Sequence, residues 1–233
     1  MIDLMIINYN MPEAVTEIID SIHSRIPHRW IVVDNGSDIV TPHPKTNVFV
    51  KENHQVMSGA LAGLQEITSE YFWDFSTSMG PIQCDGDPIA EMLSGFEGHP
   101  EIVAIFPALS GDIKSPTHTI YRQSDEHFSQ VPIGAFDGMW RTDWLKSHLD
   151  HAFTSWGIDI DLGYKARREG LTMWVNNRVV TELVERKGYP ERRHVSEEQN
   201  NRDESERMNR ILSQNYGDNW WDIMDMREAL NEH

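Results

Sequence analysis

Cysteine and long apolar runs are nearly missing from this sequence. Cys84 is the single cysteine, which excludes an internal disulfide and a zinc site built on cysteine thiolates. No apolar run reaches the roughly 18 residues that a membrane-spanning helix needs, so no transmembrane segment is expected. The chain starts on an apolar, strand-like run without the basic region and cleavage site of a secretory signal. We therefore expect a cytoplasmic protein, a location with which the lone thiol is compatible.

Basic residues are also scarce. The 20 Lys and Arg residues face 37 Asp and Glu residues, which gives a net charge of −17. Such a charge argues against nucleic acid as a partner, because phosphate backbones are bound through basic patches. A phosphorylated small ligand would need a local site made by a divalent cation, helix N-termini or a few arginines. A glycine-rich phosphate loop of the P-loop or dinucleotide type is absent as well.

What the sequence does contain is an alternation of short apolar runs and helical patterns. Strands are predicted at 1–7, 30–33, 48–50, 71–75 and 102–106, and helices from Pro12, over 57–67 and over 88–96. This β-α alternation up to about residue 107 predicts a mostly parallel sheet with helices on both faces. Ligands of such sheets bind at the carboxyl ends of the strands, where Asn8, Asp34 and the segment after Phe75 fall.

The second half is less regular. Residues 108–135 are polar and loop-like, a helix is predicted over 159–169 with Gly170 as its C-terminal cap, and a late strand over 173–180. The stretch 191–208 is strongly charged, which is typical of a solvated helix or a mobile tail. The tryptophan-rich end that follows is expected to pack on the body of the protein.

Four blocks in order along the chain resemble glycosyltransferase family 2, inverting enzymes of the GT-A fold, and its rhamnosyltransferase-like members in particular. The blocks are 6–10 (Ile-Ile-Asn-Tyr-Asn), 32–37 (Val-Val-Asp-Asn-Gly-Ser), Asn53 with Gly63-Leu64, and 156–162 (Trp-Gly-Ile-Asp-Ile-Asp-Leu) followed by 167–170 (Arg-Arg-Glu-Gly). The resemblance covers roughly 1–182. It implies one α/β GT-A domain over 1–190, with a nucleotide-sugar-binding half (1–107) and an acceptor half (108–190). A charged helical extension, 191–233, would pack on that domain.

The resemblance also implies a donor site for a UDP-, dTDP- or GDP-sugar. Its nucleotide-binding residues would be Asn8, Tyr9, Asn10, Asp34, Asn35 and Asn53. Tyr9 can stack on a base, and the Asp34 carboxylate can accept hydrogen bonds from an imide or a ribose hydroxyl. Two plainer interpretations stay open: a strand-to-helix turn with a packed Tyr9, and an Asx turn at Asp34.

The family's cation site is where this sequence departs. Family members place an Asp-x-Asp pair after the fourth strand to hold Mg²⁺ or Mn²⁺ against the diphosphate, but here the residues are Ser76 and Ser78. Neutral hydroxyls are poor ligands for hard cations. Asp85 and Asp87 have the spacing of a pair but fall at a helix start, which favours N-capping. Three outcomes stay open: no metal at this position, a metal held by other residues such as His194, or a degenerate donor site. Without a metal, Arg192, Arg193 and His194 would stabilise the leaving group.

On the acceptor side, Asp159 is the predicted general base, which would take the proton of the attacking hydroxyl. Asp161 would orient it or bind an acceptor hydroxyl, and Trp156, Asp137 and Trp140 would line the acceptor pocket. The alternatives are two carboxylates that stabilise a helix N-terminus, and tryptophans that belong to the core.

The sequence thus favours an inverting glycosyltransferase that moves a sugar to a hydroxyl of a glycan acceptor. A catalytically degenerate nucleotide-sugar-binding protein of the same fold is the main alternative. A nucleotidyltransferase or another doubly wound nucleotide binder is disfavoured, because the glycine-rich loop is absent and the late carboxylate pair suits an acceptor-side base better. The oligomeric state is not indicated.

Overall fold

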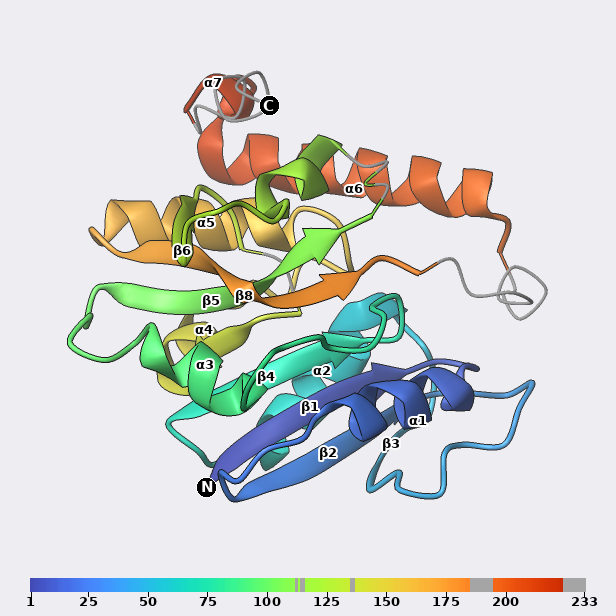
Figure 1. Cartoon of the computed structure of the whole chain (residues 1–233). Coiled ribbons are helices and arrows are strands. Elements are labelled where there is room, and N and C mark those ends of the chain that lie inside the picture. The colour runs from blue at the N-terminus through green and yellow to red at the C-terminus, as the bar shows by residue number, and fades with distance from the viewer. Residues whose placement is uncertain (112, 114–115, 135–136, 185–194, 224–233) are drawn as a thin grey trace.

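An eight-stranded sheet forms the centre of the computed structural model, which describes residues 1–111, 113, 116–134, 137–184 and 195–223 (Figure 1). The strand order is β3-β2-β1-β4-β7-β5-β8-β6. The strands are β1 (Ile2–Asn8), β2 (His28–Asn35), β3 (Val48–Val50), β4 (Tyr71–Ser76), β5 (Ile102–Ser110), β6 (Phe128–Val131), β7 (Met139–Arg141) and β8 (Thr172–Glu182). Only β7 and β6 run antiparallel to their neighbours among these strands, so the predicted mostly parallel sheet is confirmed.

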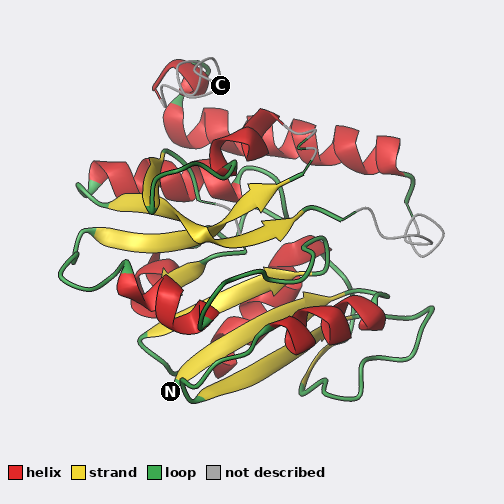
Figure 2. Ribbon diagram, in the orientation of Figure 1, coloured by secondary structure: helices red, strands yellow, loops and turns green. Residues whose placement is uncertain are grey.

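Helices cover both faces of this sheet (Figure 2). They are α1 (Pro12–Ser21), α2 (Gln55–Glu66), α3 (Pro88–Ser94), α4 (Thr142–His148), α5 (Ile158–Arg168), α6 (Glu197–Tyr216) and α7 (Trp220–Ile223), with a 3₁₀ helix η1 (Pro116–Tyr121). None of the helices in the described parts of the chain is long and apolar enough to cross a membrane.

The side-chain alternation of β1 explains the two layers. Leu4 and Ile6 pack in one cluster with α1 and α3, whereas Met5 and Ile7 pack in a second cluster with α2, α4 and α5. Successive side chains of a strand point to opposite faces, and all of β1 is buried. A nearly continuous apolar run therefore fits a strand with helices on both sides.

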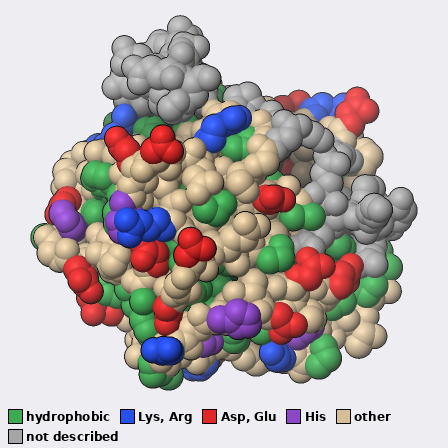
Figure 3. All heavy atoms as spheres, viewed as in Figure 1, with side chains coloured by type: hydrophobic (Ala, Val, Ile, Leu, Met, Phe, Trp, Pro, Cys, Tyr) green, Lys and Arg blue, Asp and Glu red, His purple; other side chains and the backbone are tan. Residues whose placement is uncertain are grey.

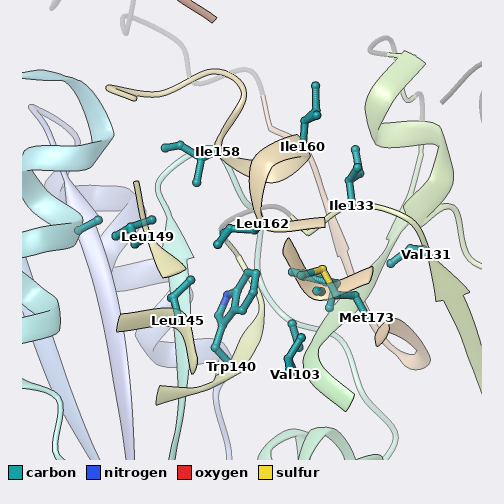
Figure 4. Close-up of a cluster of buried hydrophobic side chains, with 14 of the residues drawn as sticks. Val103, Val131, Ile133, Trp140, Leu145, Leu149, Ile158, Ile160, Leu162 and Met173 are labelled. Atoms are coloured by element: carbon teal, nitrogen blue, oxygen red, sulfur yellow. The ribbon is translucent and has the colours of Figure 1, made fainter. Parts of the chain in front are cut away.

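Trp140 of β7 lies within the second cluster, with Leu145 of α4 and Leu162 of α5 beside it (Figure 4). The sequence did not indicate β7 or α4. The loop predicted over 108–135 was wrong in part, because β5 extends to Ser110 and both η1 and β6 fall inside that stretch.

The late helices follow the sequence more closely. Gly170 has a φ of +73° just after α5, and the Leu171 N–H donates back to the Ala166 carbonyl at 2.9 Å. This is the left-handed cap that the sequence predicted. Ser196 caps the N-terminus of α6, and its hydroxyl accepts from the Gln199 N–H. α6 lies along the same side of the molecule as α5 (Figure 1) and buries Ile211 and Leu212.

Candidate functional site

Asn8 is the last residue of β1 and Asp34 the last but one of the neighbouring β2, and the two sit directly opposite each other in the register. Both are buried, and the Asn8 amide donates to Asp34 Oδ2 at 3.3 Å. Asp34 Oδ1 accepts the Ser37 N–H at 2.9 Å, while Asn8 Oδ1 accepts the Met11 N–H at 3.0 Å. The structure therefore brings these two predicted residues together as the frame of the turns after both strands.

Asn10 locks the same two turns to each other. Its φ is +57°, an unusual value for a residue with a side chain. Its buried Oδ1 accepts the N–H groups of Asp38 and Ile39 at 3.2 and 3.1 Å. Tyr9, in contrast, is half-buried, and base stacking by its ring stays a prediction.

Asn35 and Asn53 also lie together, at the carboxyl end of β2. The Asn35 amide donates to Asn53 Oδ1 at 3.4 Å and to the Gln55 carbonyl at 2.8 Å. Gln55 has a φ of +64° at the start of α2. Backbone held in such a sparsely populated region is found preferentially at functional sites. All six predicted nucleotide-side residues are thus on one edge of the sheet.

Ser76 and Asp137 meet at the end of β4. The Asp137 carboxylate accepts the Ser76 N–H at 2.5 Å and the Ser76 hydroxyl at 3.1 Å. The Ser76 and Ser78 hydroxyls are 2.6 Å apart. Asp137 was predicted to line the acceptor pocket. The structure places it in contact with Ser76, which was predicted on the donor side.

Asp137 is held there by a second carboxyl group beneath it. Asp74 accepts the N–H of Asp137 at 2.9 Å, the N–H of Gly138 at 3.1 Å and the indole N–H of Trp140 at 3.1 Å. Asp137 has a φ of +94°, so this support stabilises a strained backbone. Burial raises the pKa of Asp137 to about 6, and burial together with the nearby Asp137 charge raises that of Asp74 well above its usual value.

Trp140 accordingly belongs to the core, which was the alternative to its predicted place in the acceptor pocket. Its side chain has no exposed surface, and its only polar atom is bonded to Asp74. Contact with an acceptor stays a prediction for which this geometry offers no support.

A small cavity of about 30 Å³ adjoins Asp137. Its other walls are Met79, Phe106, Pro107, Leu109, His118, Tyr121 and Leu183. The Nδ1 atom of His118 is buried and has no hydrogen-bond partner among the described residues. Burial lowers the pKa of His118, which favours the neutral form of its ring. No pattern in the sequence singles out His118, because its neighbourhood depends on how η1 packs against β5.

One short segment connects this cavity to Asp159. The Tyr121 hydroxyl on the cavity wall donates to the Ile133 carbonyl at 3.0 Å, and the next residue, Gly134, donates its N–H to the Asp159 carbonyl at 3.3 Å. Asp159 is thus separated from the cavity wall by a single hydrogen-bonded segment.

Asp159 itself is half-buried in the first turn of α5. Burial raises the pKa of its carboxyl group, although backbone N–H groups of Ile160, Asp159 and Gly157 lower it in part. A raised pKa suits a general base, whose best value lies near the working pH. The helix-terminus interpretation is equally compatible with these N–H contacts, so the catalytic role stays a prediction.

Asp161 is in a different situation. It is buried, Lys165 Nζ lies 2.7 Å from Oδ2, and the Tyr216 hydroxyl of α6 donates to Oδ1. Burial raises its pKa, and these two partners lower it. One oxygen is engaged by Lys165 within α5 and the other joins α5 to α6, so Asp161 supports the helix that carries Asp159, and acceptor binding by it stays a prediction.

Glu204 of α6 is a buried acid that the sequence analysis missed. Its two oxygens accept the Thr154 hydroxyl at 2.9 and 3.0 Å, and one accepts the Trp156 N–H at 3.4 Å. Gly157 next to them has a φ of +90°, and a Cβ there would lie 2.7 Å from Met208 Cγ of α6. α6 therefore fixes the loop before Asp159 and leaves the Trp156 side chain exposed (41%). Trp156 as an acceptor contact stays a prediction.

A divalent cation does not fit the donors that the structure describes around Ser76. Each Asp137 oxygen already accepts a hydrogen bond from Ser76, and Asp74 accepts three from N–H groups. No cluster of three His, Cys, Asp or Glu residues exists within the described ranges. Asp87 caps α3 by accepting from Ile89 and Ala90 N–H, which confirms the capping interpretation over a metal pair. Arg192, Arg193 and His194 lie outside the described residues.

The face seen in Figure 3 shows no basic patch of the kind that binds nucleic acid. Acidic side chains are spread over that face, with Lys and Arg side chains between them rather than gathered in one basic patch.

Comparison with known proteins identifies the fold. No protein-family model and no curated protein sequence matches the chain. Among solved structures, TarS 1–349 from S. aureus matches with a TM-score of 0.57 and 12% identity over 91% of this chain and 72% of its own. The mannosyltransferase PcManGT from Pyrobaculum calidifontis, solved with GDP-Man and Mn²⁺, matches with a TM-score of 0.59 and 19% identity. GalNAc-T7, solved with UDP, GalNAc and Mn²⁺, has a TM-score of 0.59 and 11% identity.

The alignment covers a larger share of this chain than of these two structures. This chain covers 59% of the PcManGT chain and 44% of the GalNAc-T7 chain, with 82% and 79% of its own residues matched. At these identities the comparison establishes the fold, which is of the GT-A type, as the resemblance in the sequence implied.

Proposed function

We propose that this chain is an inverting glycosyltransferase that moves a sugar from a nucleoside diphosphate sugar to a hydroxyl group of a glycan acceptor. The observation that carries the proposal is the connection of Asp159 to the Ser76–Asp137 pair through Gly134 and the cavity wall. That link ends on the Asp159 main-chain carbonyl, and we propose that the Asp159 carboxyl group, whose pKa burial raises, faces the donor-side Ser76–Asp137 pair. TarS has been solved with UDP-GlcNAc and PcManGT with GDP-Man, which supports a nucleotide-sugar donor.

In the proposed reaction, Asp159 accepts the proton of the acceptor hydroxyl while the oxygen of that hydroxyl attacks the anomeric carbon. The bond from that carbon to the diphosphate oxygen breaks, the nucleoside diphosphate leaves with the bonding electrons, and the configuration inverts. Asn8, Asn10 and Asp34 would hold the turns that meet the nucleotide. The serines would lie at the diphosphate, with Arg192 and His194 as further candidates from the sequence.

The test is donor turnover by Asp159→Asn. We expect release of nucleoside diphosphate to fall by about 10²-fold or more, while nucleotide affinity stays near normal. Asp143→Asn is the matched control, because Asp143 occupies the same first-turn position of α4 and is exposed. Equal losses in both variants would assign Asp159 to helix stabilisation, and full activity of Asp159→Asn would defeat the assignment.

The second candidate is a nucleotide-sugar-binding protein without transfer activity. Ser76 and Ser78 in place of the family's acidic pair favour it. Saturable binding of a nucleotide sugar without any release, across a panel of sugar acceptors, would support this candidate over the enzyme.

A further inference from the structure

Thr154 is held from two sides in the loop that leads to Asp159. It lies three residues before Gly157, the N-cap of α5. Its carbonyl accepts the Met57 N–H at 3.0 Å, one of the N-terminal N–H groups of α2 that the helix itself cannot satisfy. Its hydroxyl donates to both Glu204 oxygens, at 2.9 and 3.0 Å. One residue therefore joins α2, α6 and the loop before α5.

α6 reaches the start of α2 at a second point. Asn200 lies one turn before Glu204 on the same face of α6, because residues four apart are neighbours on a helix surface. Its Oδ1 accepts the side-chain amide of Gln55 at 3.0 Å. Gln55 has a φ of +64°, a value that the surrounding structure must hold against its cost. The bond from α6 thus supports a strained residue.

Gln55 also connects α6 to residues predicted to contact the nucleotide. Its carbonyl accepts the Asn35 amide at 2.8 Å and the Ser58 hydroxyl at 2.9 Å. The Asn35 amide in turn donates to Asn53 Oδ1 at 3.4 Å. The turn that holds Asn35 and Asn53 is therefore linked to α6 through a single residue.

Glu204 anchors the other end of this link. Its side chain is buried, it accepts the Trp156 N–H at 3.4 Å as well as the Thr154 hydroxyl, and Arg207 Nε lies 3.8 Å from Oε1. Hydrogen bonds to an ionised group are roughly twice as strong as neutral ones. The loop before Asp159 is thus bound to α6 more firmly than by packing alone.

We propose that Thr154 is a positioning residue that couples the nucleotide-side turn at Gln55 to the helix start that carries Asp159. Asn200 and Glu204 of α6 are its supports. The inference rests on the proposed function, in which a nucleotide occupies this turn and Asp159 is the base. A ligand that restrains the turn should therefore restrain the loop as well, since coupling between two sites is reciprocal.

Hydrogen–deuterium exchange of the purified chain tests this coupling. Calorimetry first identifies which of UDP, dTDP, GDP, UDP-glucose, dTDP-glucose and GDP-mannose binds, and peptides that cover 150–160 are then compared with and without that ligand. We expect the ligand to slow exchange in this loop by about fivefold or more, the lower end of common couplings between sites. In Thr154→Val, which removes the hydroxyl, the slowing should fall below about twofold while the ligand Kd stays within about threefold.

Turnover gives a second readout, which a purely structural role would not produce. With the sugar donor that binds, Thr154→Val should lower kcat by about tenfold or more and leave the donor KM nearly unchanged, because a displaced catalytic group loses its alignment. Thr154→Ser keeps the hydroxyl and should restore both the slowing of exchange and kcat.

Two variants of α6 keep the result interpretable. Asn200→Ala leaves Thr154 in place and removes the bond to Gln55, so it should also reduce the slowing, and it provides the test if Thr154→Val does not fold. Asn201→Ala, at the exposed neighbouring position, is the matched control and should retain the full slowing.

A ligand that binds without any change in loop exchange would overturn the inference and leave the proposed function standing. So would full slowing of exchange in folded Thr154→Val. Binding of no member of the nucleotide panel would instead defeat the proposed function, and this inference with it.

Discussion

The Ser76 hydroxyl donates a hydrogen bond to Asp137 Oδ2 at 3.1 Å, across 61 residues of sequence. The two residues come from the two predicted halves of the chain, 1–107 and 108–190, and this division stays a prediction. Their contact places a carboxylate beside the serines that replace the acidic pair, and it does so through β7, which inserts between β4 and β5.

Replacing Asp137 by Asn should change the pH dependence of stability. Because burial raises the folded-state pKa from the usual 3.8 to about 6, the folded protein holds a proton that the unfolded chain releases. Wild-type stability should therefore fall as the pH rises from about 4 to about 6. Asn mimics the protonated group and does not titrate. The stability of Asp137→Asn relative to the wild type should therefore increase by about 1–2 kcal/mol between pH 4 and pH 7.5.

Urea unfolding of both proteins at several pH values measures this difference. Asp125→Asn, at an exposed position, serves as the control and should show no such trend. A wild-type protein that gains stability relative to Asp137→Asn between pH 4 and 6 would contradict the assignment.

The sequence predicted the first half of the sheet well, because β1, β2 and β4 are buried on both faces and appear as short apolar runs. It failed for β7, whose three residues are too few to show a period. The Ser76–Asp137 contact depends on that strand, and a long-range contact of this kind leaves no local pattern. The role of Asp74 could not be predicted for the same reason. It depends on hydrogen bonds from Asp137, Gly138 and Trp140, which are distant in sequence.

Glu204 should be needed for the loop that precedes Asp159. Glu204→Ala removes the acceptor of the Thr154 hydroxyl and the Trp156 N–H, which should cost about 1–3 kcal/mol of unfolding free energy. It should also lower transfer activity more than nucleotide affinity, because the loop lies on the acceptor side. Denaturant unfolding and donor turnover measure the two effects.

Glu206→Ala is the control on the same helix, since Glu206 is exposed and should change neither quantity by much. If Glu204→Ala behaves like Glu206→Ala, α6 does not order this loop. Glu204 could not be singled out within the charged stretch 191–208, because the sequence does not distinguish a buried Glu from a solvated one when the segment that packs on it is unknown.

Tyr216 should matter through its hydroxyl alone. Tyr216→Phe keeps the ring against Tyr164 and removes a hydrogen bond to the buried Asp161 carboxylate. A loss of about 1–3 kcal/mol is expected, whereas Tyr164→Phe should cost less, since the hydrogen bonds to Asp161 in the described part of the chain come from Lys165 and Tyr216. Similar losses in both variants, measured by thermal unfolding, would contradict a specific role of the Tyr216 hydroxyl.

Removal of divalent cations should have little effect on donor binding. The oxygens of Asp74 and Asp137 are already engaged by N–H and hydroxyl donors, and hydroxyls of Ser76 and Ser78 are weak ligands for Mg²⁺ or Mn²⁺. Affinity for the preferred nucleotide sugar should stay within about threefold on adding EDTA. A loss of binding that Mn²⁺ restores would show that other residues, His194 among the candidates, supply a cation site.

The most direct test of the central claim is a thermal-shift panel of UDP-, dTDP- and GDP-sugars with the purified chain. A ligand present at about 100 times its Kd adds roughly 2.7 kcal/mol, which corresponds to a Tm increase of about 5–10 °C for a chain of this size. We predict an increase of this kind with at least one nucleoside diphosphate sugar. No shift with any member of the panel would contradict a nucleotide-sugar site at this edge of the sheet.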